Sequence, residues 1–133
     1  IPEWKAIYAI PNGAKLPYAK SKTGKRFSKE AAWLLKEGMK PGTPDICCPF
    51  KSQYPNQDNY FSALYLEMKK PDNSLTPSQK KRVPILEAAG NCVKICKSTE
   101  AAFEQIRHYT YFRYLNFYPE QTITIKLLAR IKI

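Results

Sequence analysis

The 133-residue sequence contains no apolar run approaching the roughly 20 residues that a membrane-spanning helix needs, and it shows no signal-peptide pattern. Acidic residues are also scarce: 11 Asp and Glu stand against 22 Lys and Arg, so the formal net charge is +11. The first two absences argue against a membrane or secreted protein, and we expect a cytoplasmic protein (bacterial or from a virus-infected cell) or a nuclear one. The charge imbalance favours a polyanionic partner, nucleic acid before an anionic membrane surface.

Only four cysteines occur, at Cys47, Cys48, Cys92 and Cys96. Zinc sites usually present cysteines as short-spaced pairs around a turn, whereas these pairs lie in apolar stretches that are typical of strands. We therefore expect buried, reduced thiols and a reducing compartment, because free cysteine is among the most buried residue types.

The length of the chain suits one domain with a single hydrophobic core. A hydrophobic content of 44% and an aromatic content of 13% argue against disorder. The sequence begins at Ile1 rather than at methionine, so we expect native sequence upstream of it.

The hydrophobic pattern predicts seven elements in the order strand, helix, strand, strand, helix, strand, helix. The expected strands are residues 4–10, 43–50, 60–70 and 91–98, and the expected helices are 28–38, 76–90 and 98–115. Ser28 and Thr76 are the expected N-caps, Gly38 and Gly90 should end their helices, and Pro84 should kink or break the second helix. Helices interleaved with strands predict an α/β fold with a mixed central β-sheet flanked by helices.

Three charged residues are expected to meet at one end of a hairpin. Asp45 opens the second predicted strand, and Glu67 and Lys69 close the third. If the two strands are antiparallel, the start of one lies beside the end of the other. Two carboxylates can hold a hard divalent ion, and a nearby lysine can orient a water molecule and balance charge on a phosphate. The spacing alone is weak, since Glu3 and Lys5 repeat it without any supporting context.

Five segments in order resemble the virus-type replication-repair nuclease (VRR-NUC) domain over roughly residues 4–107: AIPNG, LKEGMKPGTPDICCP, LYLEMKKP, LTPSQKKRVPILEAAGNCVKIC and STEAAFEQI. The resemblance implies a restriction-endonuclease-like core of the PD-(D/E)xK nuclease superfamily. It also implies an enzyme that hydrolyses DNA phosphodiester bonds with Mg²⁺ or Mn²⁺. Selectivity for branched DNA, such as a junction or flap in replication, repair or recombination, and assembly as a homodimer are implied in the same way.

The resemblance assigns catalytic roles to four residues, Asp45, Glu67, Lys69 and Gln79. It implies that the metal is bound by Asp45, Glu67 and the backbone carbonyl of Met68. Members of the family usually carry a further acidic residue on a helix ahead of the first strand, and this sequence begins too late to show one.

Three cases, one of them a single residue, have alternative interpretations. Gln79 either completes a capping box with Thr76 or points toward the sheet and the site, since it shares a helical stripe with Val83 and Leu86. The aromatic residues between Tyr109 and Tyr118 either stack on unpaired bases or pack in the core or a subunit interface. A third set comprises basic and polar residues that are either phosphate contacts or solvated faces: Asn12, Lys15, Lys25, Arg26, Lys80 and Lys81.

The end of the sequence has a pattern of its own. We expect residues 1–116 to form the nuclease domain, and 117–133 to form an extension that packs on the domain or on a second subunit. Apolar and polar residues alternate within 121–133, which predicts an extra strand. The alternative to a nuclease is a non-enzymatic nucleic-acid-binding module with the same basic surface, but binding alone does not require two carboxylates facing a phosphate.

Overall fold

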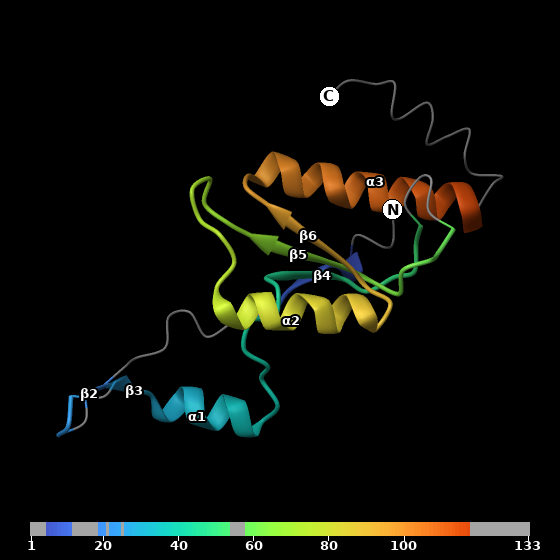
Figure 1. Cartoon of the computed structure of the whole chain (residues 1–133). Helices are drawn as coiled ribbons and strands as arrows, with labels where there is room; N and C mark the ends of the chain where they lie inside the picture. Colours follow the sequence, from blue (N-terminus) through green and yellow to red (C-terminus); the bar gives the residue numbers. More distant parts are fainter. Residues whose placement is uncertain (1–4, 12–18, 21, 25, 54–57, 118–133) are drawn as a thin grey trace.

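A computed structural model describes residues 5–11, 19–20, 22–24, 26–53 and 58–117. This part of the chain folds into a four-stranded sheet, a separate two-stranded hairpin and three helices (Figure 1). The strands are β1 (Tyr8–Ala9), β2 (Ala19–Lys20), β3 (Arg26–Phe27), β4 (Ile46–Cys48), β5 (Leu64–Met68) and β6 (Cys92–Cys96). The helices are α1 (Lys29–Lys36), α2 (Pro77–Ala88) and α3 (Thr99–Phe117).

The main sheet is mixed, as the sequence predicts. Its strand order is β1-β4-β5-β6, with β4 antiparallel to both β1 and β5, and β5 parallel to β6. The predicted antiparallel hairpin of the second and third strands is confirmed as β4 and β5. Its register pairs Ile46 with Leu66, so Asp45, one residue before β4, lies level with Glu67.

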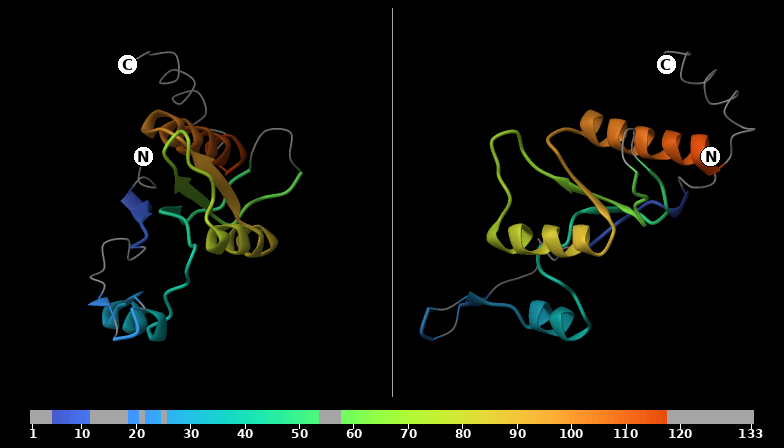
Figure 2. Two further views of the ribbon diagram at one scale, coloured as in Figure 1. Left: turned by 60° about the vertical axis from the view of Figure 1, so that its left-hand side comes forward. Right: turned by 45° about the vertical axis from the view of Figure 1, so that its right-hand side comes forward.

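The two long helices cover opposite faces of this sheet (Figures 1 and 2). Side chains alternate along β5, so Leu64 and Leu66 face α3 while Glu67 points to the face that carries α2. Tyr109 of α3 is fully buried, and its hydroxyl donates a hydrogen bond of 2.9 Å to the carbonyl of Phe50. The core on the α3 side comprises Cys48, Phe50, Leu64, Leu66, Cys92, Cys96, Ala102, Ile106 and Tyr109.

The predicted helix ends are confirmed. The hydroxyl of Ser28 accepts a hydrogen bond of 3.2 Å from the backbone N–H of Ala31, and Thr76 caps α2 with a complete capping box. Gly38 and Gly90 follow α1 and α2 with φ angles of 101° and 80°, in the left-handed region that favours glycine at a helix end.

Local predictions differ from the structure in three places. The sequence predicts no strand between residues 10 and 28, yet β2 and β3 form a hairpin there. The strands of the main sheet are shorter than expected: β1 has two residues, β4 has three, and β5 and β6 have five each. Helix α2 runs through Pro84, so the break, one of the two predicted outcomes, does not occur. Pro84 and Lys80 are both exposed, so water can hydrate the carbonyl that loses its partner. The predicted strand in 121–133 lies outside the described residues.

Helix α1 and the β2–β3 hairpin stand apart from the sheet (Figure 2). None of the residues of α1 is buried; Trp33 and Leu35 are 60% and 48% exposed. By contrast, all four cysteines are buried and free, as the sequence predicts. Among the described residues, no helix combines the length and apolar character needed to cross a membrane.

Candidate active site

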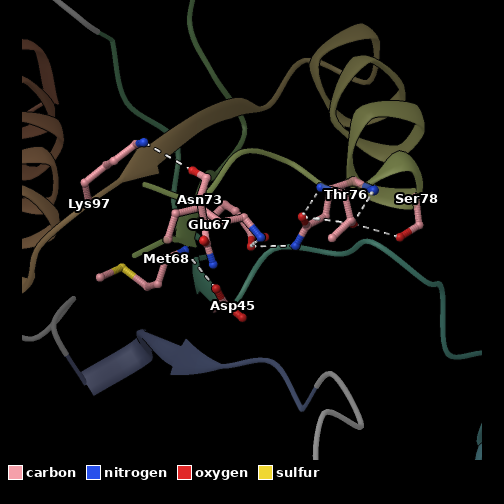
Figure 3. A network of polar contacts seen from close by, with 9 residues as sticks. Asp45, Glu67, Met68, Asn73, Thr76, Ser78 and Lys97 are labelled. Carbon is pink, nitrogen blue, oxygen red and sulfur yellow. Dashed lines mark hydrogen bonds and ion pairs between the residues drawn. The ribbon is translucent and has the colours of Figure 1, made fainter. Parts of the chain in front are cut away.

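Asp45 is fixed between two neighbouring strands at the end of the sheet. Its carbonyl accepts a hydrogen bond of 2.7 Å from the N–H of Ile10, beyond the end of β1. Its carboxylate oxygen Oδ2 accepts another of 2.7 Å from the N–H of Met68 (Figure 3). The regular pairing of β4 with β5 ends at the pair Ile46 and Leu66. Beyond that pair, the carboxylate of Asp45 takes the place of a backbone carbonyl as the hydrogen-bond acceptor for the end of β5. Hydrogen bonds to a carboxylate are stronger than neutral ones, which orients this side chain firmly.

Glu67 lies at the centre of the site and is 2% exposed. Its Oε1 atom lies 3.2 Å from Nζ of Lys69 and 2.6 Å from Nε2 of Gln79. Lys69 comes from the same face of the strand two residues later, whereas Gln79 comes from the first turn of α2. The predicted orientation of Gln79 toward the sheet is therefore confirmed, and so is its capping role, because its Oε1 accepts the N–H of Thr76 at 2.9 Å.

The carboxylate of Glu67 is in an unfavourable environment for its negative charge, and one of its two oxygens has no hydrogen-bond partner among the described residues. Burial raises the pKa of its carboxyl, and the charge of Asp45 raises it further, while Lys69 and Gln79 act in the opposite direction. Its second oxygen, Oε2, is buried with no hydrogen-bond partner among the described residues. A buried carboxylate oxygen without a partner costs free energy, and a cation at this point would offset that cost.

A cleft of about 520 Å³ opens beside these groups. It brings together all five residues predicted to act in catalysis or metal binding, and it adds a wall from α1 and the following turn. Its lining comprises Ala31, Leu35, Met39, Lys40, Pro41, Gly42, Thr43, Asp45, Glu67, Met68, Lys69, Ser78 and Gln79.

Two of the residues predicted to contact nucleic acid lie outside the cleft: Lys80 and Lys81 are exposed on α2 and do not line it. The backbone of Arg26 belongs to β3. Asn12, Lys15 and Lys25 lie outside the described residues.

Sequence reasoning missed two residues that hold the site together. Gly42 has a φ of +80°, and a Cβ atom there would overlap the backbone of Ser78 and lie 2.7 Å from the nitrogen of Gln79. Lys97 donates hydrogen bonds of 2.6 Å and 3.1 Å to the carbonyls of Pro71 and Asn73, which fixes the loop between β5 and α2. Lys97 and Asn73 are labelled in Figure 3. The sequence does offer a signal for Gly42, because it is the glycine of the predicted KPG turn at residues 40–42. No local pattern distinguishes Lys97 from the other lysines.

Comparison with known proteins supports the architecture. No protein family matches the sequence, and no curated protein matches it either. A solved structure described as a VRR_NUC domain protein superposes with a TM-score of 0.60 and 23% sequence identity, over 82% of this chain and 70% of that one. The chain has the VRR-NUC fold. This likeness confirms the α/β sheet with flanking helices that the five resembling segments imply.

The donor set fits the kind of metal that a VRR-NUC fold implies. Among the described residues, no group of three or more His, Cys, Asp or Glu side chains is placed to hold an ion. The candidates are two carboxylates, Asp45 and Glu67, with the carbonyl of Met68. Mg²⁺ typically takes one or two carboxylates and completes its shell with water and substrate phosphate. The orphaned Oε2 of Glu67 is the feature that this ion would satisfy.

Proposed function

We propose that this protein is a metal-dependent DNA endonuclease that hydrolyses phosphodiester bonds, with selectivity for branched DNA. The observation that carries the proposal is the buried Oε2 of Glu67, which has no partner among the described residues. Glu67 itself lines the cleft together with Asp45 and Lys69. Such an arrangement destabilises the free protein and becomes favourable when a divalent cation occupies it.

The residues of the cleft would have different roles in this reaction. Asp45, Glu67 and the carbonyl of Met68 would hold Mg²⁺ or Mn²⁺, which lowers the pKa of a bound water and neutralises charge on the phosphate. Lys69, whose side chain is 12% exposed, presents an ammonium group at the carboxylates to orient the attacking water and stabilise developing negative charge. Gln79 positions Glu67 through its amide nitrogen.

A non-enzymatic binding module remains the second hypothesis, and the burial of Glu67 disfavours it. Phosphate binding requires positive charge, and a buried carboxylate facing the cleft repels it. A module selected only for binding would gain from replacing Glu67 with a neutral residue, because the raised pKa of this group reflects an unfavourable environment for its charge.

The charge of the protein supports DNA as the proposed partner. The net charge of +11 and the exposed Lys80 and Lys81 on α2 would attract the phosphate backbone outside the cleft. A DNA substrate places the protein in the cytoplasm of a bacterial or virus-infected cell, or in the nucleus. A homodimer would present two sites to a branched, roughly two-fold substrate.

The decisive test incubates the purified chain with a panel of branched and linear DNAs in Mg²⁺, Mn²⁺, Ca²⁺ or EDTA. We expect cleavage in Mg²⁺ or Mn²⁺ and none in EDTA. Lys69→Ala should abolish cleavage but retain most DNA binding, whereas Asp45→Asn should lose both metal affinity and cleavage. Full activity of either variant would overturn the assignment.

Two further measurements test the partners. The affinity for DNA should fall steeply with salt, with a log–log slope of roughly −0.9 for each neutralised phosphate, and a flat response would point to another ligand. Light scattering should find a dimer that becomes a monomer after truncation at Leu115. A monomer before and after truncation would refute the dimer.

A further inference from the structure

The cleft has two walls of opposite character. Asp45, Glu67, Lys69 and Gln79 form a charged and polar wall. The other wall comes from α1 and the turn after it, and it is mainly apolar (Ala31, Leu35, Met39 and Pro41), with Lys40 and Thr43 at the turn. Ala31 and Leu35 lie four residues apart on one face of α1, and Met39 follows the end of the helix after Gly38. We call these three cleft-lining residues the apolar stripe.

This apolar stripe is not part of the hydrophobic core. Helix α1 has no buried residue, and Leu35 remains 48% exposed although it lines the cleft. Phosphate chemistry does not call for an exposed leucine opposite a pair of carboxylates. The stripe therefore points to a ligand that has an apolar face close to its reacting phosphate.

A nucleotide whose base is unpaired and unstacked meets this description. In duplex DNA the bases are stacked, and their apolar faces are hidden from a protein. A base outside the stack exposes its face, and enzymes that handle such bases hold them between apolar or aromatic side chains. The size of the cleft, about 520 Å³, lies within the roughly 300–1,000 Å³ that proteins use to enclose a small ligand.

Building on the proposed nuclease function, we infer that the stripe of Ala31, Leu35 and Met39 is a subsite for an unpaired nucleobase beside the scissile phosphate. The phosphate lies against the wall of Asp45, Glu67 and Lys69, and the base packs on Leu35 and Met39. Met39 suits this role because its flexible thioether adapts to bases of different shape. Selectivity for branched DNA then arises within one protomer, since junctions and flaps supply unpaired nucleotides and continuous duplex does not.

The test measures binding to two DNAs that differ at one nucleotide. One is a continuous duplex; the other carries a single unpaired 2-aminopurine at the mapped cleavage position, and both are titrated with the full chain in Ca²⁺. We expect wild type to bind the second DNA more tightly and to change its 2-aminopurine fluorescence. Leu35→Ala and Met39→Ala should each reduce the ratio of the two affinities by about fivefold.

Controls separate the subsite from a general effect. Trp33→Ala truncates another exposed apolar residue of α1 that does not line the cleft, and it should leave the ratio at its wild-type value. Leu35→Met keeps an apolar side chain and should restore most of the preference. Circular dichroism checks that α1 remains folded, which is expected because Leu35 is not buried.

The outcomes distinguish this inference from the proposed function. A wild type that cleaves DNA but shows no preference for the unpaired nucleotide would overturn the subsite alone. The subsite alone would also be overturned if Leu35→Ala and Met39→Ala kept the wild-type ratio of affinities for the unpaired and the continuous DNA. A protein that neither binds nor cleaves any DNA in the panel would overturn the nuclease proposal and the subsite with it.

Discussion

The amide of Gln79 reaches the buried carboxylate of Glu67, with 2.6 Å between Nε2 and Oε1. The same amide uses its oxygen to accept the N–H of Thr76 at the start of α2. One side chain therefore links the cap of a helix to the charged centre of the cleft. The two roles are compatible because an amide has separate donor and acceptor ends.

Gln79→Glu separates these roles. A glutamate can still accept the N–H of Thr76, since Glu and Gln both complete a capping box, but it cannot donate to Glu67 and it adds a second negative charge. We expect cleavage to fall by about tenfold or more, which corresponds to roughly 1.4 kcal/mol in the activation barrier. Single-turnover kinetics with Gln79→Ala, which loses both contacts, provides the comparison. Wild-type rates in Gln79→Glu would contradict a positioning role.

The metal-free protein should lose stability as pH rises, in a way that depends on Glu67. Because burial raises the pKa of this carboxyl above its ordinary value of 4.5, the unfolded chain releases the proton first. The contribution of Glu67 is therefore complete below about pH 4.5 and is lost as pH rises through the folded pKa. Urea unfolding in EDTA at pH 5 and pH 8 should show a larger loss in wild type than in Glu67→Gln.

The same two proteins report on metal binding. At a Mg²⁺ concentration 100 times the dissociation constant, wild type should gain about 2.7 kcal/mol of unfolding free energy. Glu67→Gln should gain far less, because it lacks the charged oxygen that has no partner in the folded chain. Equal stabilisation of both proteins by Mg²⁺ would place the ion elsewhere.

Gly42→Ala should damage the site without touching its charges. An added Cβ would overlap the carbonyl of Ser78 and lie 2.7 Å from the nitrogen of Gln79, so the turn at position 42 and the first turn of α2, which carries Gln79, must shift apart. We expect a loss of about 1–3 kcal/mol in unfolding free energy from overpacking and backbone strain, together with reduced cleavage.

Gly24→Ala is the matched control for this prediction. Gly24 has a φ of +77°, close to that of Gly42, but an added Cβ meets nothing within 4 Å. Gly24→Ala therefore introduces the same kind of backbone strain as Gly42→Ala but no steric overlap with another segment. If both variants lost the same stability and activity, contact with α2 would not be the reason that position 42 is glycine.

The buried thiols predict a second pH effect, at the alkaline end. Burial raises the pKa of Cys48 to about 12 from the ordinary value of 9.0, and it also raises the pKa values of Cys92 and Cys96. Their contribution to stability is full below pH 9 and is lost as pH rises above it, since the unfolded thiols ionise first. Urea unfolding between pH 7 and pH 10 measures the loss. Native thiols that react with iodoacetamide at pH 8 as fast as unfolded ones would contradict the burial.

Local chemistry made much of this fold predictable. Ser28 and Thr76 begin helices because their hydroxyls accept orphan N–H groups, and the connection between β4 and β5 favours an antiparallel pair. From that pairing the approach of Asp45 to Glu67 followed without knowledge of the other elements.

Contacts between distant segments were beyond such reasoning. The placement of Gly42 against α2 depends on how the turn after α1 packs, and Lys97 acts only through the fold of the loop at Pro71 and Asn73. The β2–β3 hairpin was missed because each strand has only two residues, too few for a hydrophobic pattern.

The exposure of α1 has a consequence for hydrogen exchange. Since none of its side chains is buried, little apolar contact opposes local opening of this helix, whereas β5 opens only with the core. The amide protons of α1 should therefore exchange at a lower free energy than those of Leu64 and Leu66. We therefore expect one wall of the cleft to open independently of the sheet, and a DNA that contacts this wall should slow exchange there first.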